Sequence, residues 1–418
     1  MKHRIVVLGA GYAGAYVAGN LARRLSPTDT EITVVNAEPD FVQRLRMHQF
    51  AAGQEVEAPR LADVFAGTGI RLRLARVTAV DPARQVVTLT DPQDGGELGY
   101  DTLLYALGSH TADHGVPGLT EHAFDVAGRP SALRLRERLD HLDRSDTAAG
   151  RSVVVVGDGL TGIETATEIA ESRPGLSVTL IARGELGAAL SDGARDHLRR
   201  ACDRLGITVR EHTTVEAVEA TRVRCADGTS VLSDATVWTA GFAVHPIAAA
   251  SGLDVTESGR IVVDRTMRSV SHPNVYAAGD SVHVIGDNGR PLPMSCASAG
   301  YTGRQAMLAI VGRLTGREIP NVKLEYVGNH ISLGRRDGIM QFVDEEARAK
   351  PKHFSGRKAA RFKAAILAMS LWTTEHPTFG LPTRTHRLTA AATQAPPHAP
   401  ADASTAASAD VPARTAAA

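Results

Sequence analysis

The chain has 418 residues, of which 43% are hydrophobic, and this composition supports globular cores in about three domains. Lys plus Arg and Asp plus Glu both number 46, so the formal net charge is zero and a nucleic-acid partner is not expected. The three cysteines form no close pair, which excludes a disulfide framework and a thiolate metal site and predicts a reducing, cytoplasmic compartment.

The first predicted element is a buried strand at residues 5–8, because four consecutive apolar residues suit a strand that is covered on both faces. The charged start resembles a signal peptide, but Gly9, Gly11 and Gly14 interrupt the apolar run before it reaches the length of an h-region. No run of eighteen apolar residues occurs in the chain, so no membrane span is predicted.

The sequence GAGYAG at residues 9–14 follows this strand directly and opens a helix, which is the context of the G-x-G-x-x-G fingerprint. The first glycine makes a tight turn, the second leaves space for a pyrophosphate, and the third lets the helix approach the strand. The N-terminus of this helix faces the phosphates. Asn36 stands at the end of the next strand, where an acidic residue normally binds the ribose, and Glu38 lies two residues beyond it. The residues predicted to bind this dinucleotide are Gly9, Gly11, Tyr12, Ala13, Gly14 and Asn36.

The same pattern returns after a linker-like segment at residues 143–150, with a strand at residues 153–156, a glycine turn and a helix. The end of its second strand also lacks an acid and carries Arg183 instead. An acidic side chain repels a 2′-phosphate whereas an arginine pairs with it, so this copy favours NADPH. A solvated Arg183, with NADH as the nucleotide, is the alternative. The residues predicted to bind NADPH or NADH here are Gly157, Gly159, Thr161, Gly162 and Arg183.

Residues 348–372 form a basic segment that holds four of the six lysines in the chain, three arginines and no acid. An apolar stripe of Phe362, Ile366 and Met369 lies within this segment, a combination that suits a helix on a membrane surface. The alternative is a solvated face whose stripe docks on the first nucleotide fold.

Two glycine fingerprints in one chain are typical of a hydride relay, because each of two stacked dinucleotides needs a cradle. With these motifs and residues 100–108, 237–241 and 274–280, the chain resembles the two-dinucleotide-binding-domain flavoproteins of the pyridine nucleotide-disulfide oxidoreductase superfamily, over residues 1 to about 312. Within them it is most similar to the type II NADH dehydrogenase branch. The resemblance implies an enzyme that passes a hydride from NADH or NADPH to bound FAD and then electrons to a quinone-like or other small-molecule acceptor.

The resemblance also implies roles for two carboxylates. Asp280, which follows Gly279 at the end of a predicted strand, is expected to bind the flavin ribitol, since a carboxylate there can accept hydrogen bonds from hydroxyls. Glu164, on the first turn of the second helix, is expected beside the nicotinamide as the catalytic residue. A carboxylate that only stabilises the positive helix end is the alternative for Glu164.

Small residues and a helix N-terminus complete the site that the resemblance implies. Backbone groups of Ser298 and Ala299, ahead of a predicted helix at residues 304–313, are expected at the flavin pyrimidine edge, where they would stabilise reduced flavin. The family's quinone signature in this region carries paired glutamines, and this chain has Tyr301 and Thr302 instead. The family's crossover strands, where larger side chains would collide with the cofactor, are matched by Ala106, Gly108, Ala240 and Gly241.

Three other functions can be weighed against the same residues, and one of them is excluded. Disulfide reductases of this superfamily carry a redox cysteine pair, and residues 41–53 contain none, which excludes disulfide reduction without an external thiol. A ferredoxin- or rubredoxin-type reductase that docks its partner on the basic segment, and a non-catalytic flavin-dependent sensor or binding protein, stay open as alternatives. His48 shares a helical face with Phe41 and Leu45 and is predicted to be a packed core histidine, and Cys296 is predicted to pack as a small apolar residue.

The predicted architecture is α/β, with two Rossmann-like FAD/NAD(P)-binding domains, a small C-terminal α+β unit and a disordered tail of Ala, Thr, Ser and Pro. Strands that end in small residues at 235–242 and 274–280 indicate a return to the first fold, so the FAD-binding domain is discontinuous. A homodimer and peripheral contact of residues 348–372 with the inner face of a membrane stay open. The predicted bounds are 1–145 and 242–325 for the FAD-binding domain, 146–241 for the NAD(P)H-binding domain, 326–388 for the C-terminal unit and 389–418 for the tail.

Overall fold

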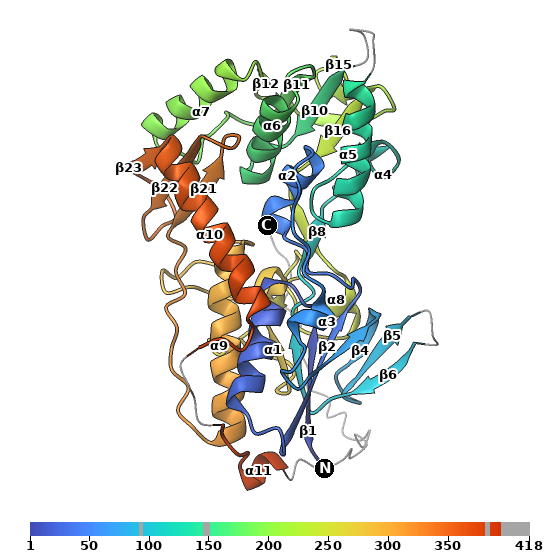
Figure 1. Ribbon diagram of the computed structural model, residues 1–418, viewed down its shortest axis with the longest axis vertical. Helices are drawn as coiled ribbons and strands as arrows, with labels where there is room; N and C mark the ends of the chain where they lie inside the picture. The colour runs from blue at the N-terminus through green and yellow to red at the C-terminus, as the bar shows by residue number, and fades with distance from the viewer. Residues whose placement is uncertain (92–94, 145–150, 381–384, 394–418) are drawn as a thin grey trace, which may run out of the picture.

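The computed structural model describes residues 1–91, 95–144, 151–380 and 385–393, and it shows an α/β chain with two parallel sheets, one in each half of the molecule (Figure 1). The first sheet has the strand order β19-β7-β1-β2-β3 and the second the order β12-β11-β10-β16-β9. The first sheet contains β1 (His3–Leu8), β2 (Thr30–Asn36), β3 (Ile70–Leu74), β7 (Thr102–Tyr105) and β19 (Val275–Ala277). The second contains β9 (Ala123–Phe124), β10 (Ser152–Val156), β11 (Ser177–Ile181), β12 (Thr208–Arg210) and β16 (Ala235–Trp238).

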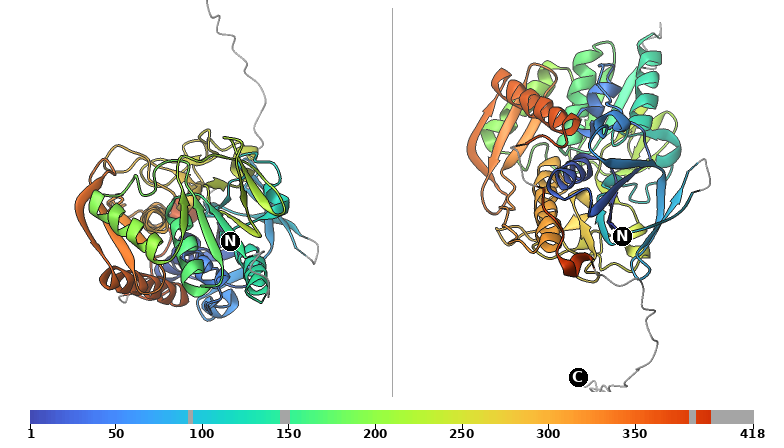
Figure 2. Two further views of the ribbon diagram at one scale, coloured as in Figure 1. Left: turned by 90° about the horizontal axis from the view of Figure 1, so that it is seen from above. Right: turned by 60° about the horizontal axis from the view of Figure 1, so that its bottom comes forward.

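The first sheet is buried because its strands are apolar on both faces, as the run of residues at 5–8 predicts. Helix α1 lays its fully buried Val17 and Leu21 in the core of this sheet, and α9 packs beside α1 (Figures 1 and 2). The strand β1, the glycine turn and α1 therefore form the first predicted nucleotide fold. The helices are α1 (Tyr12–Arg24) and α9 (Cys296–Thr315), and an antiparallel sheet beside them contains β4 (Arg76–Asp81), β5 (Val86–Thr90) and β6 (Gly96–Gly99).

The second sheet repeats this arrangement with β10, a glycine turn and α6. The buried side chains of Ile163 and Ile169 join α6 to the second core, which confirms the helical spacing of their apolar face. The helices of this half are α5 (Arg129–Asp143), α6 (Leu160–Ser172) and α7 (Asp192–Arg204), and its antiparallel sheet contains β13 (Val215–Val218), β14 (Arg222–Cys225) and β15 (Ser230–Leu232).

The two halves are joined by β8 (Ser109–Thr111) and β17 (Phe242–Val244), which pair antiparallel. Beyond β8 the chain already belongs to the second sheet, because β9 hydrogen-bonds to β16. We therefore propose that the first domain ends before β9, and not at residue 145 as the sequence predicts. A two-residue edge strand such as β9 carries too little periodicity to be found from sequence. Most of the predicted linker at residues 143–150 lies outside the described residues.

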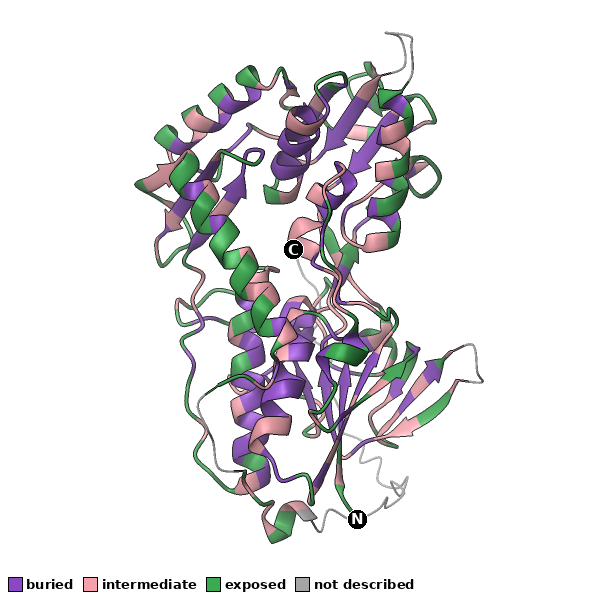
Figure 3. Cartoon of the chain, in the orientation of Figure 1, coloured by how far each residue is buried: buried purple, intermediate pink, exposed green. Residues whose placement is uncertain are grey.

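The C-terminal unit is a three-stranded antiparallel sheet followed by a long helix, α10. The sheet packs against α6 and α7 of the second half, and α10 crosses from this sheet to α1 of the first half (Figure 1). Much of the outward side of α10 is exposed (Figure 3). The elements are β21 (Gly328–Ser332), β22 (Gly338–Val343), β23 (Ala349–Ser355) and α10 (Arg357–Glu375).

The predicted tail begins later than the sequence indicates. The Thr389 N–H donates to the Leu314 carbonyl oxygen at 3.0 Å, and a short helix follows, so residues 389–393 dock against the end of α9. Residues 394–418 of the predicted tail lie outside the described part of the chain. The remaining short elements are α2 (Met47–Ala51), α3 (Leu61–Val64), α4 (Leu119–His122), α8 (Ile247–Ala250), α11 (Ala390–Thr393), β18 (Ile261–Val262) and β20 (Val282–His283).

Candidate active site

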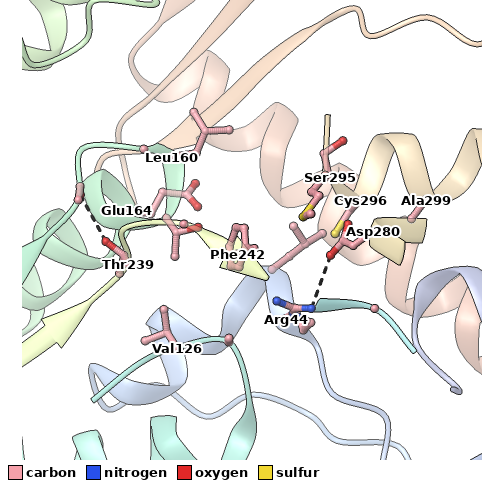
Figure 4. Close-up of a pocket in the computed structure, with 18 of the residues that line it drawn as sticks. Arg44, Val126, Leu160, Glu164, Thr239, Phe242, Asp280, Ser295, Cys296 and Ala299 are labelled. Atoms are coloured by element: carbon pink, nitrogen blue, oxygen red, sulfur yellow. Dashed lines mark hydrogen bonds and ion pairs between the residues drawn. The ribbon is translucent and has the colours of Figure 1, made fainter. Parts of the chain in front are cut away.

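A cavity of about 990 Å³ is lined by residues of both nucleotide folds and of the C-terminal unit (Figure 4). Both glycine turns, the two connecting segments, α9 and α10 contribute to the lining. Most of the predicted site residues therefore meet in one space, whereas Gly14, Gly162 and Ser298 do not line it. The predicted residues in the lining are Gly9, Gly11, Tyr12, Ala13, Asn36, Ala106, Gly108, Gly157, Gly159, Thr161, Glu164, Arg183, Ala240, Gly241, Gly279, Asp280 and Ala299.

The first glycine turn connects β1 to α1, and each of its glycines meets a different steric requirement. Gly9 has a φ of +92°, and a Cβ on it would overlap the Ala106 carbonyl oxygen. A Cβ on Gly14 would overlap the Gly9 carbonyl oxygen, so α1 approaches the strand only because Gly14 has no side chain. A Cβ on Gly11 would meet no atom within 4 Å. The turn therefore leaves room beside Gly11 for a phosphate group at the helix N-terminus.

The second glycine turn, between β10 and α6, repeats this geometry. Gly157 has a φ of +114°, and a Cβ on it would lie 2.9 Å from the Ala240 nitrogen. A Cβ on Gly162 would overlap the Gly157 carbonyl oxygen, and a Cβ on Gly159 would meet nothing within 4 Å. In both turns the first glycine has a positive φ, the second leaves open space and the third lets the helix approach the strand. A pyrophosphate cradle needs these three features, so the residues fit two dinucleotides.

Asn36 lies at the end of β2 and holds the first glycine turn in place. Its Oδ1 accepts a hydrogen bond from the Ala10 N–H at 2.9 Å, and its Nδ2 donates to the Glu38 carbonyl oxygen at 2.7 Å. These two bonds leave one lone pair on Oδ1 and one hydrogen on Nδ2 unused. Because Asn36 also lines the cavity, both can bind a ribose hydroxyl. Asn36 can therefore both shape the turn and bind the nucleotide that the turn is predicted to hold.

Asp280 lies in the short turn after β19 and is fixed by two neighbours (Figure 4). Ser109 Oγ donates to Asp280 Oδ2 at 2.6 Å, and Arg44 Nη1 lies 3.7 Å from the same oxygen. Arg44 also donates to the Ser109 carbonyl oxygen at 2.9 Å. The sequence predicts Asp280 but neither partner, because Arg44 lies in a three-residue 3-10 helix and Ser109 on a three-residue strand, where no pattern marks a contact.

The start of α9 requires a correction. Helix α9 begins at Cys296, where the sequence predicts a helix only from residue 304. The Ser298 N–H donates to Ser295 Oγ at 3.1 Å, and the Ala299 N–H donates to the Ser295 carbonyl oxygen at 2.9 Å. Both amides predicted to reach the flavin are thus used inside the helix. The N–H groups of Cys296 and Ala297 occupy the first two helical positions, which have no intrahelical acceptor, and both residues line the cavity.

Thr302 joins α9 to the turn that carries Asp280. It is fully buried, its Oγ1 accepts a hydrogen bond from the Gly279 N–H at 3.0 Å, and the same hydroxyl donates to the Ser298 carbonyl oxygen at 2.7 Å. Tyr301 packs, partly buried, against the first core and does not line the cavity. Thr302 therefore has a positioning contact of its own where the family's quinone signature carries a glutamine.

Glu164 lies on the first turn of α6, is buried, and lines the cavity. Its Oε1 accepts a hydrogen bond from the Ser332 N–H at 2.8 Å and forms an ion pair with Lys363 Nζ. Lys363 Nζ also donates to the His330 carbonyl oxygen at 3.1 Å. Burial lowers the pKa of the Lys363 ammonium to about 7. The catalytic candidate thus has a titratable partner from the C-terminal unit.

Lys363 does not belong to the basic surface that the sequence predicts. It lies on the inner side of α10, whereas Lys350, Lys352 and Lys358 are exposed. Lys363 differs from the other three lysines in its burial, which depends on how α10 packs and not on the local sequence. The basic segment is also divided between β23 and α10, so it is not one continuous helix.

The apolar stripe of α10 is exposed, although one of its members, Ile366, also lines the cavity. Phe362, Ile366, Met369 and Trp372 are between 36% and 61% exposed, so the alternative in which the stripe docks on the first fold is wrong. Leu371, on the other side of the helix, does pack against the first core. Within the described residues, no helix is both long and apolar enough to cross a membrane.

Cys296 lies beside Asp280 in the cavity lining (Figure 4). Burial raises the pKa of its thiol to about 12, so the thiol stays protonated near neutral pH and is a poor nucleophile. Among the described residues, no three or more His, Cys, Asp or Glu side chains gather where they could hold a metal ion.

His48 is buried on α2, and its Nε2 has no hydrogen-bond partner among the described residues. Burial, with smaller contributions from the positive charges of Lys363 and Arg46, lowers the pKa of its imidazole from 6.5 to about 3. His48 is therefore neutral in the folded chain and, as the sequence predicts, is packed in a core.

The buried imidazole predicts a loss of stability in acid. Below pH 6.5 the unfolded chain binds a proton at His48 that the folded chain excludes, so stability falls as the pH falls towards 3. At pH 5 the loss amounts to roughly 2 kcal/mol. A His48→Leu variant is expected to lose about that much less free energy of unfolding than the native chain between pH 7.5 and 5, in urea titrations. The exposed His141→Leu variant should behave like the native chain, and equal losses in all three would contradict the assignment.

Comparisons with known proteins agree with this geometry. Residues 3–303 match the family described as pyridine nucleotide-disulphide oxidoreductase. An NADH dehydrogenase-like protein of Mycobacterium tuberculosis is 31% identical over 80% of this chain and 87% of its own length. The demethylphylloquinone reductase of Synechocystis is 27% identical over 81% of this chain and 86% of its own. The solved structure of Plasmodium falciparum NDH2 in complex with NADH shares the fold, with a TM-score of 0.76 at 14% identity over 91% of this chain and 97% of that one.

Proposed function

Because the chain belongs to the pyridine nucleotide-disulphide oxidoreductase family and is an NAD(P)H-dependent flavoprotein oxidoreductase, we propose that its electron acceptor is a quinone or a quinone-like small molecule. The observation that carries the proposal is the extension of the cavity from the first glycine turn to the apolar side chains of Ile366 and Leu367 on α10. A relative that is a demethylphylloquinone reductase supports the same class of acceptor.

We assign FAD to the first glycine turn. When bound, FAD accepts a hydride on its isoalloxazine ring and passes the electrons to a second substrate. Gly11 leaves room for its pyrophosphate, and Asp280 accepts hydrogen bonds from the ribitol. Because Ser109 and Arg44 hold Asp280, its carboxylate has a fixed place in the cavity lining.

We assign NAD(P)H to the second glycine turn. Gly159 leaves room for its pyrophosphate at the N-terminus of α6, and Thr161 lines the same wall. The small residues Ala240 and Gly241 also line the cavity, and we propose that a larger side chain there would separate the two reacting rings. The main contribution of the chain is thus to place donor and acceptor rings against each other.

Charges around the site suit electron and proton transfer. The free N–H groups of Cys296 and Ala297 at the start of α9, with the Arg44 guanidinium, supply positive potential where the reduced flavin carries negative charge. Reduction of a quinone also consumes protons. Lys363, with a pKa of about 7, can release a proton at neutral pH, and the Glu164 carboxylate holds the ammonium in place. We assign Lys363 as the proton-holding group of the acceptor reaction.

A bulky side chain in the part of the cavity beside α10 is expected to block the acceptor. The Leu367 side chain lines the cavity from α10, so a Leu367→Trp indole would occupy the proposed quinone path. Reoxidation of the reduced flavin by menadione is expected to slow roughly tenfold or more, while reduction by NAD(P)H keeps its rate. Stopped-flow absorbance of the flavin measures both half-reactions. Ala368→Trp is the matched control, because Ala368 is exposed on α10 and does not line the cavity, and equal slowing in both variants would contradict the path.

Anaerobic mixing with donors and acceptors tests the function as a whole. The bound flavin should bleach with NADPH or NADH and recover with menadione. Recovery with a ferredoxin but not with menadione would replace the quinone by a protein acceptor, and recovery with neither would favour a sensor. No bleaching by either nucleotide would overturn the assignment of the second glycine turn.

The exposed stripe of α10 suggests where a quinone could enter. Phe362, Met369 and Trp372 lie on the same helix as the cavity-lining Leu367, and basic residues such as Lys358 lie close by in sequence. We propose that this side of α10 rests on a membrane surface and receives quinone from it. Flotation with anionic and with neutral vesicles tests this contact, since binding should require the anionic lipid.

A further inference from the structure

The adenosine end of the second nucleotide site lies where β11 and the segment after β12 meet the cavity. Ile181, Arg183 and Thr214 line the cavity there. We propose that this end recognises a 2′-phosphate through Arg183, so that NADPH is strongly preferred over NADH as the electron donor. The inference rests on the assignment of NAD(P)H to the second glycine turn.

The strand end lacks the group that NADH-binding folds place there. An acidic side chain at this point normally accepts hydrogen bonds from both ribose hydroxyls and repels a 2′-phosphate. Here the strand runs into Ala182, which is fully buried and engaged through its backbone alone: its N–H donates to the Arg210 carbonyl oxygen at 2.8 Å, and its carbonyl oxygen accepts from the Thr213 N–H at 3.0 Å. The position therefore carries no negative charge.

The neighbouring carboxylates are already paired. Glu211 Oε1 accepts hydrogen bonds from Arg199 Nη2 and from the Leu186 N–H, both at 2.7 Å. Glu185 forms ion pairs with Arg195 at 3.3 Å and with Arg199 at 3.4 Å. These contacts offset the negative charge near the strand end. Asp158 also lines the cavity, but it belongs to the glycine turn, which faces the pyrophosphate that NADH and NADPH share.

Arg183 itself is available for a ligand. Its side chain is exposed, it lines the cavity, and no hydrogen bond or ion pair joins it to any other described residue. An arginine that serves the fold usually pairs with a carboxylate, as Arg199 does here. A guanidinium can donate two parallel hydrogen bonds to a phosphate, which gives affinity and orientation together. A free guanidinium at the cavity edge, beside Glu185 and Glu211 carboxylates that already pair with other arginines, suits a 2′-phosphate.

Arg210 provides a matched comparison. It ends the neighbouring strand directly beside Ile181, but it does not line the cavity and its guanidinium donates to Thr229 Oγ1 at 3.3 Å. An effect of general positive charge on nucleotide binding would appear in both arginines. Specific recognition of the 2′-phosphate would appear in Arg183 alone.

The test measures binding of nucleotide fragments to the FAD-loaded protein by calorimetry, which does not depend on turnover. The native chain is expected to bind 2′,5′-ADP roughly 10- to 100-fold more tightly than 5′-AMP, since a charge-assisted hydrogen bond is removed with the phosphate. Arg183→Ala should abolish this difference by weakening 2′,5′-ADP alone, and Arg210→Ala should keep it. The ratio of kcat/KM for NADPH and NADH should change in parallel.

The outcomes distinguish the preference for NADPH from the assignment of NAD(P)H to the second glycine turn. Equal affinities of the native chain for 2′,5′-ADP and 5′-AMP, with flavin still reduced by NADH, would overturn the preference and leave the nucleotide site intact. Equal weakening of both fragments in Arg183→Ala would overturn the role of that residue. Failure of both fragments to bind, together with no flavin reduction by either nucleotide, would overturn both the preference and the assigned site.

Discussion

A Gly159→Val chain is expected to fold, to retain its FAD and to lose about 100-fold or more in kcat/KM for NAD(P)H. Gly159 has φ −69° and ψ 176°, which valine adopts without strain, and a Cβ there meets no atom within 4 Å. The new side chain would instead occupy the space that the pyrophosphate needs. Steady-state kinetics, with the flavin absorbance as a measure of retained FAD, checks this expectation.

The first glycine turn supplies the complementary variant. Gly11 has an equally ordinary φ of −72° and the same open space, so Gly11→Val is expected to lose FAD and to yield a colourless protein. Gly300→Val is the control, because Gly300 is exposed on α9, has no atom within 4 Å of a built Cβ and does not line the cavity. Native kcat/KM in Gly159→Val, or full FAD in Gly11→Val, would contradict the assignment of the two cradles.

Lys363→Met is expected to lower the free energy of unfolding by about 3–5 kcal/mol, because it leaves the buried Glu164 carboxylate without its counter-charge. Urea unfolding at pH 6, where the Lys363 ammonium with its pKa of about 7 is mostly charged, measures the loss. Lys358→Met, on the exposed side of the same helix, should cost far less.

The double variant Glu164→Gln with Lys363→Met distinguishes structure from chemistry. Removing both charges should recover most of the lost stability, since no unpaired buried charge remains. Reduction and reoxidation of the flavin should be slow, because the carboxylate expected beside the nicotinamide and the amine proposed to hold the proton are both gone. A double variant with native rates would limit the pair to a structural role. One as unstable as Lys363→Met would show that the unpaired Glu164 charge is not the cause of the lost stability.

Local patterns predicted those parts of the molecule that depend on short stretches of chain. The strand, glycine turn and helix at residues 5–24, and the same arrangement at residues 153–172, require specific residue types at fixed spacing, so the sequence alone identifies them. The small residues Ala106 and Gly241 were predicted from the family resemblance instead. In the structure the Ala106 carbonyl oxygen lies against Gly9, and a Cβ on Gly241 would lie 3.1 Å from His114 Nε2. The predicted burial of His48 is confirmed, but the helical face assumed for it with Phe41 and Leu45 is wrong, because α2 begins only at Met47.

Contacts between distant segments could not be predicted in this way. The pairing of Glu164 with Lys363 joins residues of two separate domains, and only packing turns Lys363 inward while nearby Lys358 stays exposed. Arg44 reaches Asp280 from a three-residue 3-10 helix, which is too short to show a repeating pattern. The position of the α9 N-terminus was missed by eight residues because Ser295, the capping residue, is followed by small side chains that carry little helical periodicity.

Helix α10 acts as a strut between the two halves of the molecule. One part of it packs on the C-terminal sheet beside α6, and its far end meets α1, where Gly19 has no room for a side chain against the Pro377 carbonyl. A hinge motion that separated the halves would have to detach this helix and expose the Lys363 ion pair to water. We therefore expect α10 to hold the two glycine turns at a fixed separation while nucleotide and acceptor bind.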